Sequence, residues 1–262
     1  MQEHIIVVKD GKVGKIIFNK PNKLNSLTIE MLKQIKIAVE ELDNDPNIHV
    51  LLIIGNGKGF CVGADYTIID ELTAMEAVKI RDTLYKHFAG GVKALKLCSK
   101  PTIAMVRGPA VGAGCEIAIA CDFRIVSETA MFREVWVKLG MTSPLGGLFL
   151  LPRLVGLSRA TEMFMTGKPV NGKEAERIGL ANKCVSDDKL DDEAMAFAKK
   201  LAQGAPLALS AIKEGLRRGM ESTLYAEWEA NSSAQAILLS SEDFRGAIKA
   251  RKESRNPDFK GR

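Results

Sequence analysis

The sequence has few histidines, no paired cysteines and no long apolar run, and each shortage argues against a class of protein. None of its three histidines, His4, His49 and His87, lies near a plausible nucleophile in a motif, which argues against a serine or cysteine hydrolase. Its five cysteines are scattered without a C-x-x-C pair, so we expect buried, reduced thiols and neither a disulfide framework nor a metal site. No apolar run reaches the roughly 18 residues of a membrane-spanning helix.

The net charge and the amino-terminal residues limit the ligands and the cellular location that we expect for the protein. The net charge of +5 is spread along 262 residues. It suits a small anionic ligand but is too low for a nucleic-acid-binding surface, so no nucleic-acid partner is expected. The first residues lack the basic and apolar regions of a signal peptide, which predicts a cytoplasmic protein without a membrane partner.

Strand and helix signals alternate from the first third of the chain onward, up to Pro144. Short β-rich runs are predicted at 4–8, 13–18, 50–54, 102–106 and 123–126. A helix is predicted from the N-cap Thr28 to Asp45-Pro46. After Pro144 the pattern is mostly helical, apart from a short strand at 182–185. This order predicts an α/β fold with a helical C-terminal section.

Two glycine-rich loops each follow a buried strand and run into a helical pattern. They span 60–65 (FCVGAD) and 108–116 (GPAVGAGCE). Small residues let a ligand approach the backbone, and a helix N-terminus presents unpaired N–H groups. Two such amides converging on one oxygen would form an oxyanion hole. The alternative is tight packing without a ligand. Neither loop matches the dinucleotide-binding or P-loop pattern.

Glu116 is the most informative single residue. It lies in the stretch 113–121, which has no other charged side chain and no lysine or arginine one helical turn away. A buried, unpaired carboxylate has a raised pKa and is a good acid, base or water-positioning group. The alternative is a helix that faces solvent at this one position.

Seven segments, in this order, resemble the enoyl-CoA hydratase/isomerase (crotonase) family, and together they cover nearly the whole chain. They are PNKLNSL (21–27), FCVGAD (60–65), KPTIA (100–104), GPAVGAGCE (108–116), ACDFRI (120–125), LPRLVG (151–156) and AERIGL (175–180). The resemblance implies a crotonase-like spiral of β-β-α units over 1–190 and a helical trimerisation region over 191–262. It also implies an acyl-CoA substrate and a homotrimer or homohexamer. Coenzyme A is part of that substrate, so no separate cofactor and no metal are expected.

The resemblance also assigns roles to individual residues. The backbone N–H groups of Ala64 and Ala113 would bind the thioester oxygen, and Glu116 would be one of two catalytic glutamates. Further residues would contact the substrate: Lys23, Leu24, Val62, Asp65 and Tyr66 on two loops, and Phe259 and Lys260 in the tail, which would reach the CoA of a neighbouring subunit.

The match breaks at the second glutamate, whose place is taken by Trp136. Glu134 is two residues away, and on a helix two residues rotate a side chain by about 200°, so we do not expect it to substitute. The following segment, 141–147, has no carboxylate. Trp136 would form either a flat wall for a cyclic or aromatic acyl group or a part of the core.

The sequence therefore predicts a lyase that adds water to a 2-enoyl-CoA or a cyclic dienoyl-CoA, with Glu116 as the base. Double-bond isomerisation and decarboxylation are the rival reactions, because both need the oxyanion hole but at most one proton shuttle. A CoA-binding or RNA-associated homologue with little turnover is a rival of another class, and a protein-interaction scaffold is the least specific alternative.

Overall fold

The computed structural model describes residues 3–262, and within this range the strands form two sheets. The larger sheet has the order β1-β2-β3-β4-β6-β9, in which β1 is antiparallel to β2 and the other neighbours are parallel. Its strands are β1 (Ile5–Asp10), β2 (Val13–Phe18), β3 (Val50–Gly55), β4 (Thr102–Val106), β6 (Phe123–Ser127) and β9 (Lys183–Val185). The smaller sheet has the order β5-β7-β8 and consists of β5 (Pro109–Val111), β7 (Met131–Arg133) and β8 (Val170–Asn171).

Helices connect the strands and cover the larger sheet. Those before β9 are α1 (Ile29–Asn44), α2 (Tyr66–Thr73), α3 (Ala77–Thr83), α4 (Ala89–Leu97), α5 (Ala113–Ala120), α6 (Gly147–Val155), α7 (Leu157–Thr166) and α8 (Gly172–Arg177). Those after β9 are α9 (Leu190–Ala202), α10 (Pro206–Gly219), α11 (Leu224–Ser240) and α12 (Glu242–Lys252). Short helical turns add Pro21–Lys23, Leu84–Phe88, Trp136–Leu139 and Asp187–Lys189.

The first helix shows how local sequence sets these elements. Thr28 caps α1, and its side chain accepts a hydrogen bond from the Met31 N–H. An apolar stripe of α1 is buried against the sheet, and the helix ends at Asp45, before a proline. Gly91 on α4 packs against α1, where an added Cβ would lie 3.5 Å from the Leu32 carbonyl oxygen. The predicted helix is present.

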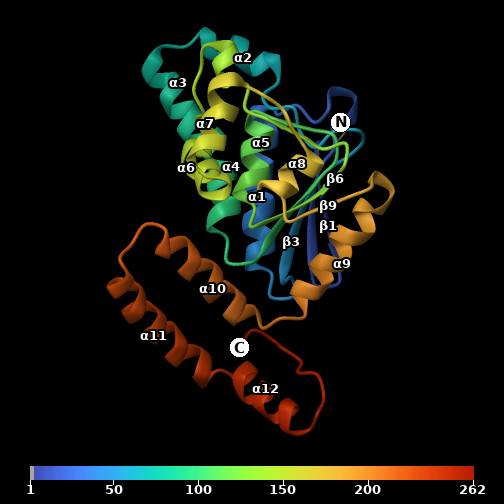
Figure 1. Cartoon of the computed structure of the whole chain (residues 1–262), viewed down its shortest axis with the longest axis vertical. Coiled ribbons are helices and arrows are strands. Elements are labelled where there is room, and N and C mark those ends of the chain that lie inside the picture. The colour runs from blue at the N-terminus through green and yellow to red at the C-terminus, as the bar shows by residue number, and fades with distance from the viewer. Residues whose placement is uncertain (1–2) are drawn as a thin grey trace.

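Two apolar clusters lie on the two faces of the larger sheet. The larger cluster joins the sheet to α1, α4 and α5, and the smaller one joins it to α9 through side chains such as Leu190 and Ala198. Figure 1 shows α9 on the side of the sheet opposite α1 and α5. Because α9 covers the sheet, the part of the chain that stands apart from the body begins with α10. The domain division at residue 190 stays a prediction.

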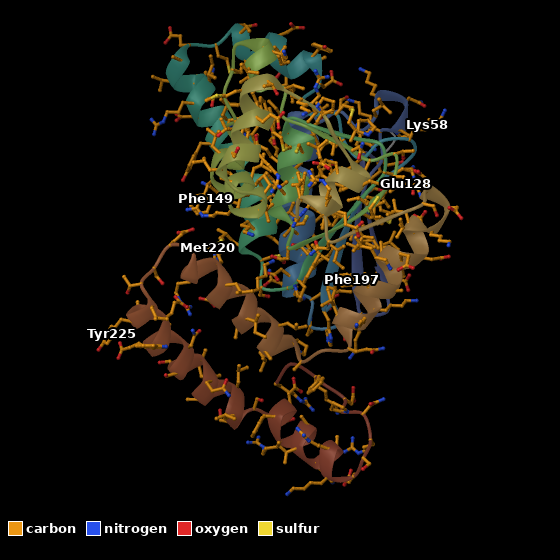
Figure 2. All side chains as sticks on the ribbon, in the orientation of Figure 1. Lys58, Glu128, Phe149, Phe197, Met220 and Tyr225 are labelled. Carbon is orange, nitrogen blue, oxygen red and sulfur yellow. The ribbon has the colours of Figure 1, made fainter. Side chains whose placement is uncertain are left out.

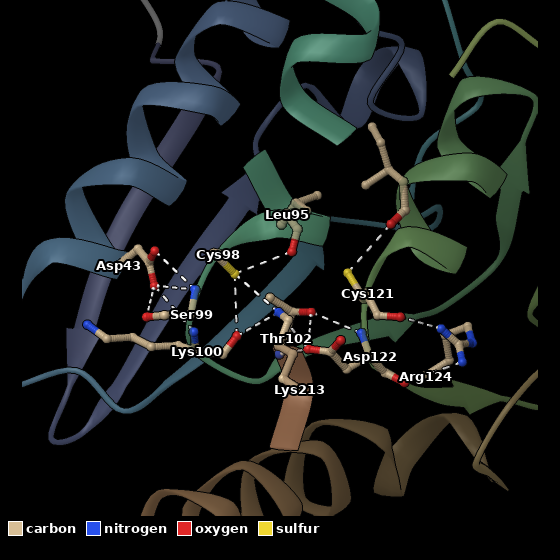
Figure 3. Close-up of polar contacts among 11 residues, drawn as sticks. Asp43, Leu95, Cys98, Ser99, Lys100, Thr102, Cys121, Asp122, Arg124 and Lys213 are labelled. Atoms are coloured by element: carbon tan, nitrogen blue, oxygen red, sulfur yellow. Dashed lines mark hydrogen bonds and ion pairs between the residues drawn. The ribbon is translucent and has the colours of Figure 1, made fainter. Parts of the chain in front are cut away.

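Helices α10 to α12 form an arm that extends away from the body (Figure 1). A polar cluster fastens its first helix to the start of β4 (Figure 3). Lys213 on α10 lies 2.8 Å from the Asp122 carboxylate, and the same carboxylate accepts hydrogen bonds from the amide and the hydroxyl of Thr102. Lys213 also donates to the Lys100 carbonyl oxygen at 2.8 Å. Within residues 3–262, no helix is both long and apolar enough to cross a lipid bilayer.

Candidate active site

The two glycine-rich loops lie side by side in the structure. The amide of Cys61 donates to the Pro109 carbonyl at 3.0 Å, and the amide of Val111 donates back to the Cys61 carbonyl at 2.9 Å. Gly114 permits this approach, because an added Cβ would lie 2.1 Å from the Cys61 oxygen. A Cβ at Gly63 would lie 3.5 Å from the Ala113 nitrogen, so the first loop faces the start of α5.

The predicted oxyanion amides belong to these facing segments. Ala113 is the first residue of α5, where a helix leaves its N–H groups unpaired. Ala64 lies directly before Asp65, the N-cap of α2. In the described part of the chain, neither the Ala64 nor the Ala113 amide donates to a protein oxygen outside the regular ladders. The arrangement leaves both free for one ligand oxygen.

Glu116 lies on the same side of α5 as Ala113, since residues three apart share a helix face. It is fully buried, and one carboxylate oxygen accepts a 2.7 Å hydrogen bond from the Gly147 amide. Burial raises the pKa of Glu116 to about 7, and the Gly147 N–H partly offsets that rise. The predicted burial is present, and the solvent-facing alternative is wrong.

Glu134 is the residue that the sequence analysis missed. It lies outside any helix, between β7 and the helical turn that starts at Trp136, so the helical rotation assumed for it does not apply. Its carboxylate is fully buried and accepts a 2.7 Å hydrogen bond from the Trp136 indole N–H. Burial, and then the nearby Glu116 charge, raise the pKa of Glu134 to about 8. The helical rotation was the reason for not expecting Glu134 to substitute for the second glutamate, and that reason is wrong.

Trp136 is nearly buried and lies beside the candidate active site. It is 8% exposed, and its ring lies 3.6 Å from where a Cβ on Gly112 would be, just before the oxyanion residue Ala113. The same indole also lowers the pKa of Glu116, which places it within reach of both carboxyl groups. Gly112 has a φ of 52°, a left-handed conformation that favours glycine, and the indole ring packs beside it at an ordinary contact distance.

The predicted CoA-contacting loops adjoin each other near this site. The Val62 amide donates to the Leu24 carbonyl at 3.1 Å, while Lys23 and Tyr66 have exposed side chains. Asp65 differs from them because it is buried. Its carboxylate lies 2.7 Å from the Lys20 ammonium and accepts a hydrogen bond from Ser26, and these contacts hold its pKa well below its usual range.

The two tail residues lie elsewhere in the same chain. The Phe259 carbonyl accepts a 3.5 Å hydrogen bond from Lys12, which precedes β2. The Lys260 amide donates to Asp243 on α12. Lys12 lies at the amino end of the parallel strands, whereas the site loops follow their carboxyl ends. The tail is therefore remote from the site loops of its own chain, and its role at a neighbouring subunit stays a prediction.

The described residues, 3–262, contain no group of three or more histidine, cysteine or carboxylate side chains placed to hold a metal ion. In that range the cysteines are free thiols, and four are buried, as the sequence predicted: Cys61, Cys98, Cys115 and Cys121.

Comparison with known proteins places this geometry in a family. A family model described as enoyl-CoA hydratase/isomerase matches residues 9–262. A short-chain-enoyl-CoA hydratase of Clostridium acetobutylicum is 36% identical over 99% of this chain and 98% of its own length. A crotonyl-CoA hydratase of Syntrophomonas wolfei is 34% identical over 98% of both chains. The crystal structure of an enoyl-CoA hydratase of Bacillus anthracis superposes with a TM-score of 0.93 at 29% identity, covering 99% of this chain and 100% of the other. These matches confirm the predicted fold and resemblance: the chain belongs to the enoyl-CoA hydratase/isomerase family.

Proposed function

We propose that this protein is an enoyl-CoA hydratase, in which Ala64 and Ala113 hold the thioester oxygen and Glu116 activates the attacking water. The observation that carries the proposal is the buried Glu116 carboxylate, placed on the α5 face that begins with the unpaired Ala113 amide.

The chemistry follows from these groups. Attack of water at the β-carbon moves electrons through the α-carbon to the thioester oxygen, where negative charge develops. Two backbone N–H groups aimed at that oxygen stabilise the charge without reorganising. One oxygen of Glu116 is held by Gly147, and the other is buried without a hydrogen-bond partner among the described residues, so it is free to accept a proton from water.

The apolar side chains around Glu116 favour a small or flat acyl group. Trp136 contributes an indole ring beside Gly112, and Leu145, which is also buried, belongs to the same apolar cluster. The two curated relatives described above are named for short-chain and crotonyl substrates. We therefore take crotonyl-CoA as the first substrate to test and a cyclic dienoyl-CoA as the second. Coenzyme A enters as part of the substrate, so the proposed reaction uses no separate cofactor.

The test is hydration of crotonyl-CoA by the wild-type chain and by Glu116→Gln. Loss of the positioned base should slow hydration about 10²- to 10⁴-fold. Mass spectrometry of the product distinguishes hydration, which adds one water, from isomerisation, which leaves the mass unchanged, and from decarboxylation, which removes CO₂. Full activity of Glu116→Gln, or no added water with any enoyl-CoA, would contradict the proposal.

The arm also supports assembly of several copies into a homotrimer or a homohexamer. Helix α11 exposes large apolar side chains along its length, including Leu224, Tyr225, Trp228, Ile237 and Leu239. Figure 2 shows Tyr225 at the start of α11, on the outer side of the arm. Exposed apolar side chains in this number are expected to be covered by a partner, and within this chain α11 is covered mainly by α10 and α12.

A further inference from the structure

Three buried polar atoms without hydrogen-bond partners gather around the candidate site. Among the described residues, the buried side-chain oxygens and nitrogens that lack a partner are Gln34 Oε1, Glu116 Oε1, Glu134 Oε1 and Ser143 Oγ. Ser143 Oγ and the Glu116 carboxylate lie on either side of Gly147, since both come within 2.9 Å of the place that a Gly147 Cβ would take, and the Glu116 charge raises the pKa of Glu134. Unpartnered buried oxygens are costly, so their grouping points to a polar guest such as water or a reacting carbonyl compound.

The surroundings of the two carboxyl groups differ in a way that separates their roles. Glu116 accepts a hydrogen bond from the Gly147 amide, which stabilises its ionised form. The Glu116 charge raises the pKa of Glu134, whereas the Cys115 thiol and the Trp136 indole, as hydrogen-bond donors, lower it. Burial raises the pKa of that thiol well above its ordinary value, so Cys115 stays neutral. Two buried carboxyl groups without a cation between them are most stable when they share one proton.

We propose that Glu134 is the second catalytic residue of the hydration reaction: held by the Trp136 indole, it delivers a proton to the substrate α-carbon while the Glu116 carboxylate takes one from water. The proposal rests on the proposed hydratase function and adds to it the proton donor that Trp136, at the position of the second glutamate, cannot supply.

The step balances atom by atom. The water oxygen bonds to the β-carbon and releases a proton to Glu116, and the double-bond electrons move toward the thioester oxygen. When these electrons move back from the thioester oxygen to the α-carbon, the α-carbon forms a bond to the proton of Glu134. One water has been added, and the pair still holds one proton, which passes from Glu116 back to Glu134 before the next turnover. Trp136 is a positioning residue, because its N–H holds a Glu134 oxygen at 2.7 Å and makes no bond to the substrate in this scheme.

The pH profile of hydration provides a readout that a purely structural role would not change. Glu116 must be ionised, so activity should rise as the pH increases through about 7. Glu134 must be protonated, so activity should fall as the pH increases through about 8. In Glu134→Gln we expect crotonyl-CoA hydration to fall about 10²- to 10⁴-fold and the alkaline limb to disappear. In Trp136→Phe, which removes the N–H that stabilises both charged forms, both limbs should move to higher pH.

Exchange of the α-hydrogens of butyryl-CoA in D₂O tests proton transfer at the α-carbon alone, because this saturated thioester cannot be hydrated. Glu134→Gln should lose the exchange, Glu116→Gln should keep it, and calorimetry should show that both still bind butyryl-CoA. The control is Glu128→Gln on the surface, where Glu128 pairs with Lys173, and it should behave as wild type.

The outcomes separate this inference from the proposed function. Wild-type hydration that is lost in Glu116→Gln but unchanged in Glu134→Gln would retain the function and overturn the role of Glu134. Exchange that persists in Glu134→Gln would overturn it as well, whatever the hydration rate. A wild-type chain that hydrates no enoyl-CoA would refute the function itself, and the exchange experiment would still decide which carboxyl group serves the α-carbon.

Discussion

Glu116 fits into its buried position because Gly147, which lies against its carboxylate, has no side chain. An added Cβ at this position would lie 2.8 Å from the Glu116 carboxyl carbon and 2.9 Å from the oxygen that the Gly147 amide binds. A contact this short displaces one of the two groups. Because α6 starts at Gly147 and is packed into the main apolar cluster, the carboxylate is the group that can move.

We therefore expect Gly147→Ala to misplace the base while the chain still folds. Hydration of crotonyl-CoA should fall about 10²-fold, which is the cost of an acid/base group moved from its working geometry. The matched control is Gly90→Ala in α4, where only the flexible end of Lys36 lies near an added Cβ. Steady-state kinetics of both variants, with a thermal unfolding curve for each, would test this. Equal loss of activity in the two alanine variants would count against a specific role for Gly147.

At the scale of elements, the oxyanion amide of Ala64 depends on how its loop is anchored. Asp65 caps α2 through the Thr67 amide, and its other oxygen binds Lys20 and Ser26 from the preceding loop. The Leu27 amide donates to the Gly63 carbonyl at 2.8 Å. Ala64 therefore lies between an ion pair and a backbone bridge, and its N–H direction is fixed by both.

Asp65→Asn keeps the shape of the side chain but removes its charge. Lys20 would then be left mostly buried without a counter-ion, and breaking such a pair costs about 3 kcal/mol. We expect a loss of this size in urea unfolding, together with a lower kcat as the Ala64 amide loses its orientation. Asp10→Asn is the control, since Asp10 pairs with Lys15 at a more exposed position, where an ion pair adds little to stability. A stability loss no greater than that of the control would show that the loop does not depend on this pair.

The larger elements could be predicted from the sequence, whereas the smaller sheet could not. Strands β2, β3, β4 and β6 are mainly apolar segments of five or six residues, and each lies where the pattern predicts it. Strands β5, β7 and β8 have three, three and two residues, which is too short for any periodicity to show. Their pairing depends on contacts between distant segments, such as the Gly112 amide with the Arg133 carbonyl.

This limit explains why Glu116 was found and Glu134 was not. Glu116 is recognisable because its whole segment is apolar. Glu134 has Arg133 beside it in sequence, and its burial becomes visible only when the segment after β7 is folded into the core. A signal was present in the sequence, namely a carboxylate two residues before a tryptophan that could donate to it, but its meaning depended on a backbone direction that the sequence pattern did not reveal.

At the scale of the whole molecule, the body and the arm are stabilised differently. The body has apolar clusters on both faces of its sheet. Contacts such as the ion pair between Lys213 and Asp122 join the arm to the body. Every residue of α10 keeps part of its surface exposed to solvent. Figure 2 shows Phe149 at the edge of the body and Met220 at the end of α10, two residues that line one groove of about 630 Å³. Few residues of the arm are buried within its own chain. In the proposed assembly, contacts with other copies would therefore supply most of the arm's stability.

The proposed assembly would bury exposed apolar side chains of α11. Ile237 on α11 is 68% exposed, and Ile237→Glu would place a charge in an interface between copies, where burying it unpaired costs several kcal/mol. We expect the wild-type chain to sediment as a trimer or a hexamer at micromolar concentration and Ile237→Glu to sediment as smaller species. Gln235→Glu adds the same charge to the same helix at a position that is already polar, and it should assemble as wild type does. A monomeric wild-type chain would refute the proposed assembly. Dissociation of both variants alike would mean that added charge on α11, and not loss of the apolar Ile237 contact, separates the copies.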